Sequence, residues 1–170
     1  MVQIRQAEVG DAAALADLQE RTFRATFGAD NNAADIDLHC RNTYSAVLQE
    51  AEIRNPALTT LVGEYEEQLV AFVQLHSALV PGDVGATPAV EIKRIYLDTA
   101  WHGRGLAQQL MDRSIGQARS LGATRIWLGV WEHNPRAISF YKKFGFAEAG
   151  EHIFMVGNDP QRDLILQRAL

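Results

Sequence analysis

The chain has 170 residues, of which 47% are hydrophobic and 22% are charged. That length supports one domain with a buried core and leaves too little for two. A formal net charge of −5 disfavours a nucleic-acid partner, and it either favours a cationic substrate or only aids solubility. The single cysteine, Cys40, excludes an internal disulfide, and the sequence has neither an apolar run long enough to span a membrane nor a signal-peptide core. We therefore expect a cytoplasmic protein with no membrane partner, in which Cys40 is structural.

The N-terminal third predicts one strand followed by two helices. Residues 2–7 alternate as a strand does, and a helix is expected to start at Val9-Gly10-Asp11 and to stop at the polar break 28–32. A second helix is expected over residues 33–53, because apolar residues recur at helical spacing and Asn55-Pro56 ends it. One side of this second helix would carry Ile36, Cys40, Tyr44, Val47 and Leu48.

The middle of the chain predicts a β-hairpin. Its strands are residues 59–65 and 68–80, joined near Glu66-Glu67 although that turn lacks glycine. Residues 81–88 have the composition of a surface loop, with two prolines and two glycines.

The C-terminal half predicts alternating strands and helices. The expected strands are Ala89–Leu97, residues 124–131, and two short ones over residues 146–154 and 163–169 around a turn at 157–160. A helix over residues 105–120 is ended by Leu121-Gly122, and another begins at Asn134-Pro135 and ends before Gly145. The order β, α, α, β, β, β, α, β, α, β, β predicts one α/β domain on a mixed, mostly antiparallel sheet.

Two glycines with an arginine between them open the helix at residue 105, in the segment Trp101-His102-Gly103-Arg104-Gly105-Leu106-Ala107. Backbone N–H groups at such a helix start can cradle a phosphate, and glycine lets the backbone approach closely or adopt a positive φ. A dinucleotide-binding motif would need a third glycine where Gln108 stands, and a P-loop would end in Gly-Lys-Ser/Thr. The pattern therefore predicts an anion-binding loop for a cofactor that carries a pyrophosphate.

Two motifs in the second half resemble those of the GNAT acetyltransferase superfamily. The family's loop, Gln/Arg-x-x-Gly-x-Gly/Ala, is matched by His102-Gly103-Arg104-Gly105-Leu106-Ala107, with His102 in place of the usual Gln or Arg. The later signature, an Asn that opens a helix ending in Tyr-x-x-x-Gly-Phe, is matched by Asn134 and by Tyr141-Lys142-Lys143-Phe144-Gly145-Phe146. The match runs from about Glu91 to Gly150.

The resemblance implies an α/β (α+β) fold in a single N-acetyltransferase domain, residues 1–170, with a β-bulge and a wedge between the two central strands. Residues 1–57 would be the variable helices on the substrate side, and residues 89–150 the acetyl-CoA-binding core. Many relatives pair as dimers, so a homodimer is a further implication.

Acetyl-CoA is the co-substrate that the resemblance implies. Its pyrophosphate would lie on the backbone N–H groups of residues 103–107, with His102 beside the phosphates. Backbone groups of Ile95 and Leu97, on the bulged strand, would hold the pantetheine arm and stabilise the oxyanion that develops on the acetyl carbonyl. Asn134 would bind the pantetheine amides while it caps its helix, or would only cap it.

Two catalytic groups also follow from the resemblance. Tyr141 would be the general acid that protonates the leaving thiolate of CoA, unless it is only an aromatic residue on an apolar helix face. Glu91 would be the base that takes a proton from the attacking amine, directly or through a water, unless it is a surface carboxylate paired with a cation such as Lys93.

Other polar and aromatic residues carry weaker expectations. Four acids would either draw a cationic substrate or simply be solvated: Asp30, Asp35, Asp37 and Glu132. Four histidines have no metal-ligand spacing and are expected to be structural or exposed: His39, His76, His133 and His152. Trp127 and Trp131 are expected in the core, in preference to a cage around the substrate, and no metal site is expected.

Further stretches look like the PaiA-type bacterial polyamine acetyltransferases, which acetylate spermidine and spermine. They are residues 22–27, 126–132 and 137–143 and a tail with His152, Met155, Gly157 and Asp163-Leu164-Ile165. This similarity implies a small polyamine as the acceptor. Two alternatives stay open: the same chemistry on a protein or peptide amine, which an open groove over the sheet would favour, and a CoA-binding module without catalysis, which the presence of both Tyr141 and Glu91 disfavours.

Overall fold

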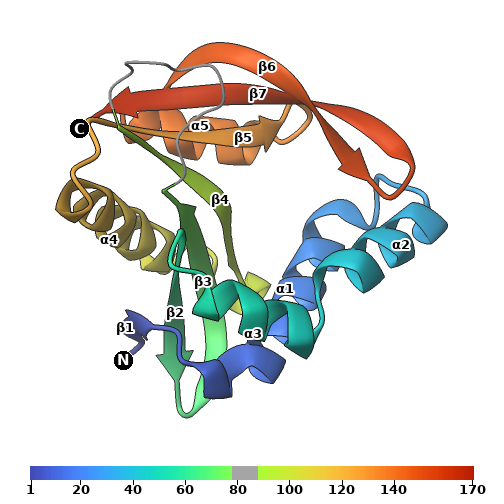
Figure 1. Ribbon diagram of the computed structural model, residues 1–170. Coiled ribbons are helices and arrows are strands. Elements are labelled where there is room, and N and C mark those ends of the chain that lie inside the picture. The colour runs from blue at the N-terminus through green and yellow to red at the C-terminus, as the bar shows by residue number, and fades with distance from the viewer. Residues whose placement is uncertain (78–87) are drawn as a thin grey trace.

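The computed structural model describes residues 1–77 and 88–170, whose strands form one seven-stranded sheet in the order β1-β2-β3-β4-β5-β7-β6 (Figure 1). The strands are β1 Gln3–Gln6, β2 Leu58–Tyr65, β3 Gln68–His76, β4 Ala89–Leu97, β5 Arg125–Trp131, β6 Ala147–Val156 and β7 Asp159–Ala169. Only β4 and β5 pair in parallel, and the other neighbours are antiparallel. The mixed, mostly antiparallel sheet predicted from the sequence is confirmed.

Helices cover both faces of this sheet (Figure 1). They are α1 Ala12–Phe27, α2 Ala33–Thr43, α3 Ala46–Arg54, α4 Leu106–Ser120 and α5 Pro135–Lys143. Helices α4 and α5 share the larger core with the strands, where Leu110, Ile126 and Tyr141 are buried together. Helix α1 covers the opposite face, where Leu15 and Phe72 belong to a second cluster. We call this second side of the sheet the α1 face.

The single helix predicted over residues 33–53 is wrong, because the chain forms α2 and α3 there instead. Tyr44 leaves the helical region (φ −117°, ψ 79°), and the Ser45 hydroxyl begins α3 by accepting a hydrogen bond from the Leu48 backbone N–H. The break turns the apolar side of the predicted helix outward at Val47, which is 79% exposed, while Tyr44 stays buried.

The predicted hairpin of β2 and β3 is confirmed, including its turn at Glu66-Glu67. Both glutamates adopt positive φ, 48° and 64°, as a type I′ hairpin turn requires at its two central residues, here without glycine. The last residues of the predicted second strand, 78–80, and residues 81–87 of the predicted loop lie outside the described residues.

The last two strands extend closer to their turn than predicted: β6 has 10 residues and runs two residues past the predicted end at 154, and β7 has 11 residues and begins four residues before the predicted start at 163. They stay paired up to Val156 and Asp159, so the turn shrinks to Gly157-Asn158. The tip of this hairpin reaches α2 (Figure 1), where the Asn158 N–H donates a hydrogen bond of 3.0 Å to the Asp35 carboxylate. The hairpin therefore closes over the α1 face.

A gap separates the two central strands beyond their first residues. Strands β4 and β5 pair at residues 89–91 and 125–127 and then diverge. On the other side of β4, Gln74 and Leu75 of β3 face Arg94 and Ile92, so that Lys93 is one extra residue in β4. The expected bulge and wedge are both present.

Candidate active site

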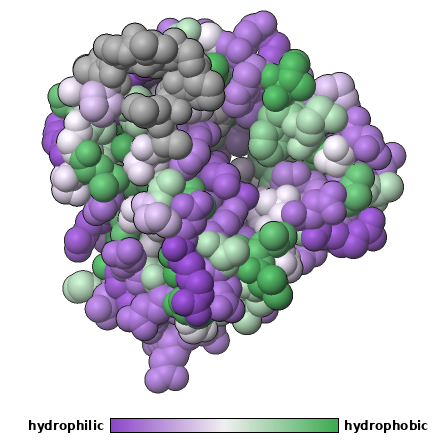
Figure 2. Space-filling view, in the orientation of Figure 1, coloured by the Kyte–Doolittle hydropathy of each residue, from purple (hydrophilic) through white to green (hydrophobic). Residues whose placement is uncertain are grey.

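A cavity of about 980 Å³ lies at the gap between β4 and β5 and continues onto the α1 face. Its walls come from both central strands, from α1, α2, α5 and the loop before α4, and from the hairpin of β6 and β7. Figure 2 shows its opening as a hollow near the centre of the molecular surface, with hydrophobic side chains beside it. Segments from both halves of the chain therefore meet around one site.

The glycine loop before α4 lies at one end of this cavity and has the conformation that an anion site needs. Gly103 and Gly105 have φ of 74° and 81°, and a Cβ on either would meet no atom within 4 Å. Glycine is therefore favoured here by the backbone conformation and not by crowding. Within the described chain, the N–H groups of residues 103–108 donate no main-chain hydrogen bond. These free donors at the start of α4 fit a diphosphate.

His102 stands beside this loop together with a cation that the sequence analysis missed. Its Nδ1 lies 3.1 Å from Nη1 of Arg136, an exposed residue in the first turn of α5. Arg104 places its guanidinium 5.5 Å from the ring centre of Trp101. Arg136 follows Asn134-Pro135 directly in the sequence. This position could have identified it, because the start of α5 faces the start of α4 across the gap.

The backbone N–H and C=O groups of β4 face the gap at Ile95 and Leu97, the two positions that the sequence analysis expected to bind the pantetheine arm. The Asp98 N–H donates to the Val70 carbonyl of β3 at 2.9 Å. Because hydrogen bonds alternate along an antiparallel ladder, Arg94 and Tyr96 also bond toward β3, and the backbone groups of Ile95 and Leu97 face the gap. Both residues line the cavity.

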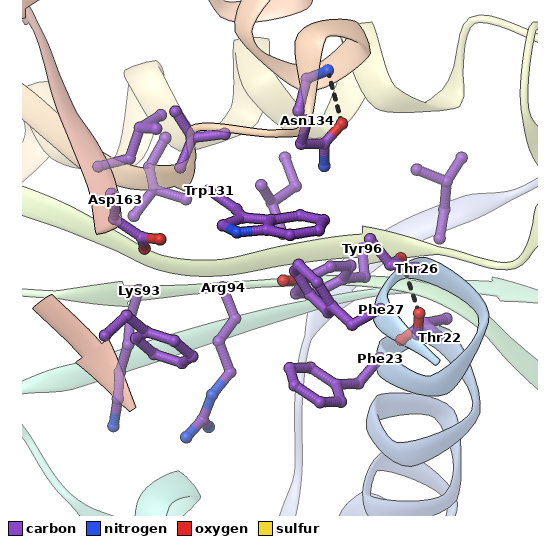
Figure 3. Close-up of a pocket in the computed structure, with 18 of the residues that line it drawn as sticks. Thr22, Phe23, Thr26, Phe27, Lys93, Arg94, Tyr96, Trp131, Asn134 and Asp163 are labelled. Atoms are coloured by element: carbon purple, nitrogen blue, oxygen red, sulfur yellow. Dashed lines mark hydrogen bonds between the residues drawn. The ribbon is translucent and has the colours of Figure 1, made fainter. Parts of the chain in front are cut away.

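Asn134 caps α5 as expected, because its Oδ1 accepts a hydrogen bond of 3.2 Å from the Ala137 N–H (Figure 3). Capping uses only this oxygen. The amide nitrogen points away from the helix and into the cavity (Figure 3). The side chain can therefore cap α5 and donate to a ligand at the same time.

Tyr141 lines the cavity from α5 and is only 8% exposed. Burial, with a smaller effect of Tyr96, raises the pKa of its phenol well above the usual value. The phenol therefore carries its proton throughout the neutral range and is available as a proton donor.

Glu91 is the last residue of β4 that pairs with β5, and it also lines the cavity. Its Oε2 lies 3.4 Å from Nδ1 of His76. It is not paired with Lys93, whose Nζ lies 3.2 Å from Glu52 Oε1. The cation pairing considered for Glu91 therefore involves a histidine, which is charged only when it is protonated.

Several aromatic rings line the cavity on the α1 face (Figure 3). The ring centre of Phe27 lies 5.6 Å from that of Trp131 and 6.4 Å from that of Tyr96. The expectation that Trp131 is a core residue holds only in part, since Trp131 is half-buried, packs against a buried cluster that includes Phe27, and also lines the cavity. Residues alternate along β5, so Ile126, Leu128 and Val130 pack toward α4 and α5, and Trp131 points to the α1 face.

Two basic residues of β4, Arg94 and Lys93, line the same cavity and pair with one carboxylate, that of Glu52. Arg94 Nη1 lies 2.8 Å from Glu52 Oε2 and 3.0 Å from Gln74 Oε1. The pKa of Glu52 lies below its usual value: burial alone would raise it, but the charge of Arg94 and hydrogen bonds from Gln74 and Arg94 outweigh burial. The positive charge of Arg94 and Lys93 is thus partly neutralised from α3.

Three of the acids expected to attract a cation are already in contact with other groups. Asp35 accepts from Asn158, Asp37 from Arg24 and Glu132 from Arg162. Asp30 is exposed, as a solvated acid would be. Among residues 1–77 and 88–170, no three or more His, Cys, Asp or Glu side chains gather in a metal-binding arrangement. No helix in the same residues has the length and apolar character needed to cross a membrane.

The chain matches known proteins along most of its length. The model of the acetyltransferase (GNAT) family matches residues 13–146. An uncharacterised N-acetyltransferase of Lactobacillus delbrueckii subsp. lactis is 30% identical over 169 residues, which cover 99% of this chain and 98% of that protein. The spermine/spermidine N(1)-acetyltransferase of Bacillus subtilis is 27% identical over 129 residues, covering 72% of this chain and 85% of that protein.

The fold matches solved structures as well. The crystal structure of the PaiA N-acetyltransferase from Thermoplasma acidophilum in complex with coenzyme A superposes with a TM-score of 0.82 at 19% identity, covering 100% of this chain and 99% of the other. This agreement confirms the single-domain fold implied by the two sequence motifs. The matched family model and the relative at 30% identity decide the family. The chain belongs to the GNAT family of N-acetyltransferases, which take their acetyl group from acetyl-CoA.

Proposed function

We propose that this enzyme transfers the acetyl group of acetyl-CoA to a primary amine of a small cationic acceptor, with polyamines favoured, by direct attack while both substrates are bound. The observation that carries the proposal is the gap between β4 and β5, with free N–H groups of residues 103–108 at one end and Tyr141 on its wall. The diphosphate would bind these amides, and Ile95, Leu97 and Asn134 would hold the pantetheine arm. Acetyl-CoA supplies an activated acetyl group.

Each protein group then has one task in the transfer. Glu91 takes a proton from the acceptor ammonium, directly or through a water, so that the nitrogen lone pair is free to attack. A backbone N–H of β4 stabilises the negative charge that develops on the acetyl oxygen, an effect worth about 3 kcal/mol for one such donor. Tyr141 gives its proton to the sulfur as the carbon–sulfur bond breaks, and the acetylated nitrogen gives up its extra proton, which restores the neutral phenol directly or through a water.

A polyamine acceptor is supported by the similarity to a spermine/spermidine acetyltransferase and by the chemistry of the cavity wall. Aromatic rings attract ammonium groups through their faces, and Glu52 offsets the charge of Arg94 and Lys93. The hairpin tip on α2 closes one side of the site, which favours a small acceptor over a protein or peptide amine. A CoA-binding module without catalysis is disfavoured because Tyr141 and Glu91 line the same cavity.

The role of Tyr141 is tested by Tyr141→Phe, which removes the proton donor and keeps the ring. Turnover should fall by ~10²-fold or more, the size expected for a general acid, while acetyl-CoA affinity measured by calorimetry stays unchanged. Tyr65→Phe is the matched control, because Tyr65 lies on β2 outside the cavity. Undiminished turnover in Tyr141→Phe would remove Tyr141 from the mechanism.

The role of Glu91 is tested through the pH dependence of turnover. Glu91→Gln removes the base, so a larger share of the acceptor must already be neutral, and the pH–rate profile should shift toward higher pH. A profile that coincides with that of the wild type would mean that another group accepts the proton. Release of free thiol with spermidine, spermine, aminoglycosides and lysine peptides would rank the acceptors, and preference for a peptide would overturn the polyamine assignment.

A further inference from the structure

A histidine and an aspartate from the two last strands meet inside the cavity on the α1 face. Asp163 of β7 lies opposite His152 of β6 on one side and Trp131 of β5 on the other. His152 Nε2 is 3.6 Å from Asp163 Oδ2. Asp163 is only 8% exposed, and all three residues line the cavity. Asp163 is thus buried in the site wall, and the His152 side chain, which is 38% exposed, reaches it from the rim of the cavity.

Gly129 of β5 makes room for this pair. A Cβ at residue 129 would lie 2.8 Å from His152 Nε2 and 3.2 Å from Asp163 Oδ2, so both side chains lean over the glycine. Gly129 lies two residues after Trp127, which is the last residue of β5 that pairs with β4. The pair therefore stands at the point where the gap opens, on the side from which an acceptor would approach.

Both polar groups of the pair keep bonding capacity for a ligand. His152 Nε2 is buried and makes no hydrogen bond to any group in the described part of the chain. With the ring proton on Nδ1, Nε2 offers a lone pair, and the Asp163 carboxylate offers several more. An ammonium group has three N–H donors and could use both acceptors at once.

Among the described residues, no Lys or Arg forms an ion pair with the buried carboxylate of Asp163. Arg94 and Lys93 lie across the gap on β4, but their side chains run away from Asp163 (Figure 3) and both are held by Glu52. Burial raises the pKa of Asp163. The adjacent His152 offsets this effect only in its protonated form, in which Nε2 is a donor; with neutral His152, a bound ammonium would supply the positive charge instead. Burial raises the pKa of Tyr96, and the charge of Asp163 raises it further. The Asp163 carboxylate therefore acts electrostatically on a residue that lines the gap.

We infer that Asp163 and His152, with the ring of Trp131 beside them, form the subsite that binds the acceptor's ammonium group. The inference rests on the proposed function and adds to it the residues that select a cationic acceptor. The ammonium donates N–H bonds to the carboxylate and to Nε2, and the Trp131 ring adds a cation–π contact. Asp163 binds the acceptor, and Glu91 on β4 remains the base.

The decisive experiment compares Asp163→Asn with Asp159→Asn, a matched change at an exposed position of the same strand. Binding of spermidine and of putrescine to the CoA-bound protein would be measured by calorimetry, together with the KM for both substrates. Asp163→Asn should weaken amine binding and raise the amine KM by roughly 10–100-fold, as for a lost hydrogen bond to a charged group. The KM for acetyl-CoA should stay within about twofold, and Asp159→Asn should behave as the wild type.

Three further variants keep the subsite testable if Asp163→Asn folds poorly. Gly129→Ala places a methyl group against the pair from β5, and it should weaken amine binding without removing any charge. His152→Leu removes the lone pair and should weaken binding less than Asp163→Asn, and His152→Gln, which restores an acceptor atom, should recover part of the loss.

The outcomes separate the subsite from the proposed function. Amine affinity unchanged in both Asp163→Asn and Gly129→Ala would overturn the subsite, and so would a wild-type protein that binds neither amine. If the wild type binds the amines but does not acetylate them, the proposed function is wrong. The subsite is then judged by the binding data of the variants alone. If Asp163→Asn weakens amine and acetyl-CoA equally, Asp163 supports the fold and does not select the acceptor.

Discussion

Glu52, on α3, is the carboxylate that holds two cations of β4 at the edge of the cavity. The side chains of Glu52 and Arg94 are only 20% and 13% exposed. Removing one partner of such a pair leaves the other charge in a poorly solvated place, which costs more than the pair itself contributes. The same removal would leave Arg94 and Lys93 to repel a cationic acceptor.

Glu52→Ala should therefore lower the free energy of unfolding at pH 7 by about 3 kcal/mol, the lower end for buried pairs. The folded-state pKa of Glu52 lies below its ordinary value of 4.5. Its contribution is thus complete above pH 4.5 and is lost as pH falls through the lowered pKa, so the wild type and the variant should converge in acid. Urea unfolding at pH 7 and pH 4 measures both effects.

Glu50→Ala is the control for this prediction. Glu50 pairs with Arg54 at 3.0 Å on the exposed side of the same helix. Exposed pairs of this spacing contribute no more than about 0.5 kcal/mol. A loss at Glu52 no larger than that at Glu50 would contradict the role assigned to the Glu52 carboxylate.

At the scale of elements, the hairpin of β6 and β7 and helix α2 close the site together. Gly157 in the hairpin turn has φ of 60°, and a Cβ there would lie 2.6 Å from the Asp35 backbone of α2. The contact between the two elements thus depends on a residue without a side chain. Because this contact bounds the acceptor side of the cavity, loosening it should weaken acceptor binding as well as stability.

Gly157→Ala should lower the free energy of unfolding by about 2 kcal/mol, because the added Cβ strains a left-handed backbone and collides with α2. The same change should raise the KM for the amine more than the KM for acetyl-CoA. Chemical denaturation and steady-state kinetics check the two parts. Gly116→Ala, in the exposed middle of α4 where a Cβ meets nothing within 4 Å, should instead stabilise by about 0.5–1 kcal/mol. The prediction is wrong if the two variants behave alike.

At the scale of the whole molecule, the two halves of the sheet are joined between β4 and β5 by only three residue pairs. A ligand that fills the gap between them contacts the loop before α4, the start of α5 and both strands at once. It binds the folded chain and has no equivalent site in the unfolded one, so binding must stabilise the fold.

Acetyl-CoA at about 100 times its Kd should add about 2.7 kcal/mol, which for a domain of this size raises Tm by roughly 5–11 °C. Thermal unfolding followed by circular dichroism measures the shift, and adenosine at the same concentration should produce little. Gly105→Trp should abolish the shift while the protein still unfolds cooperatively, because the space beside Gly105 is open. A full shift in this variant would place the diphosphate away from the loop.

The sequence by itself determined the features that depend on neighbouring residues. Gly103 and Gly105 mark a loop whose backbone needs positive φ, and Asn134 caps the helix that it begins. Alternation and turn residues located the strands that form the gap. These features involve contacts within a few residues, which a local pattern records.

Only the tertiary structure decided which distant side chains meet. His152 reaches Asp163 through the register of β6 on β7, Arg136 reaches His102 across the gap, and Glu52 reaches Arg94 from a helix that was predicted to be part of another. Trp131 lines the cavity as well as packing on the core because of the face on which β5 presents it. Strand register and the packing of α2 and α3 set these contacts, and each depends on burial summed over the whole chain, which no short stretch of sequence contains.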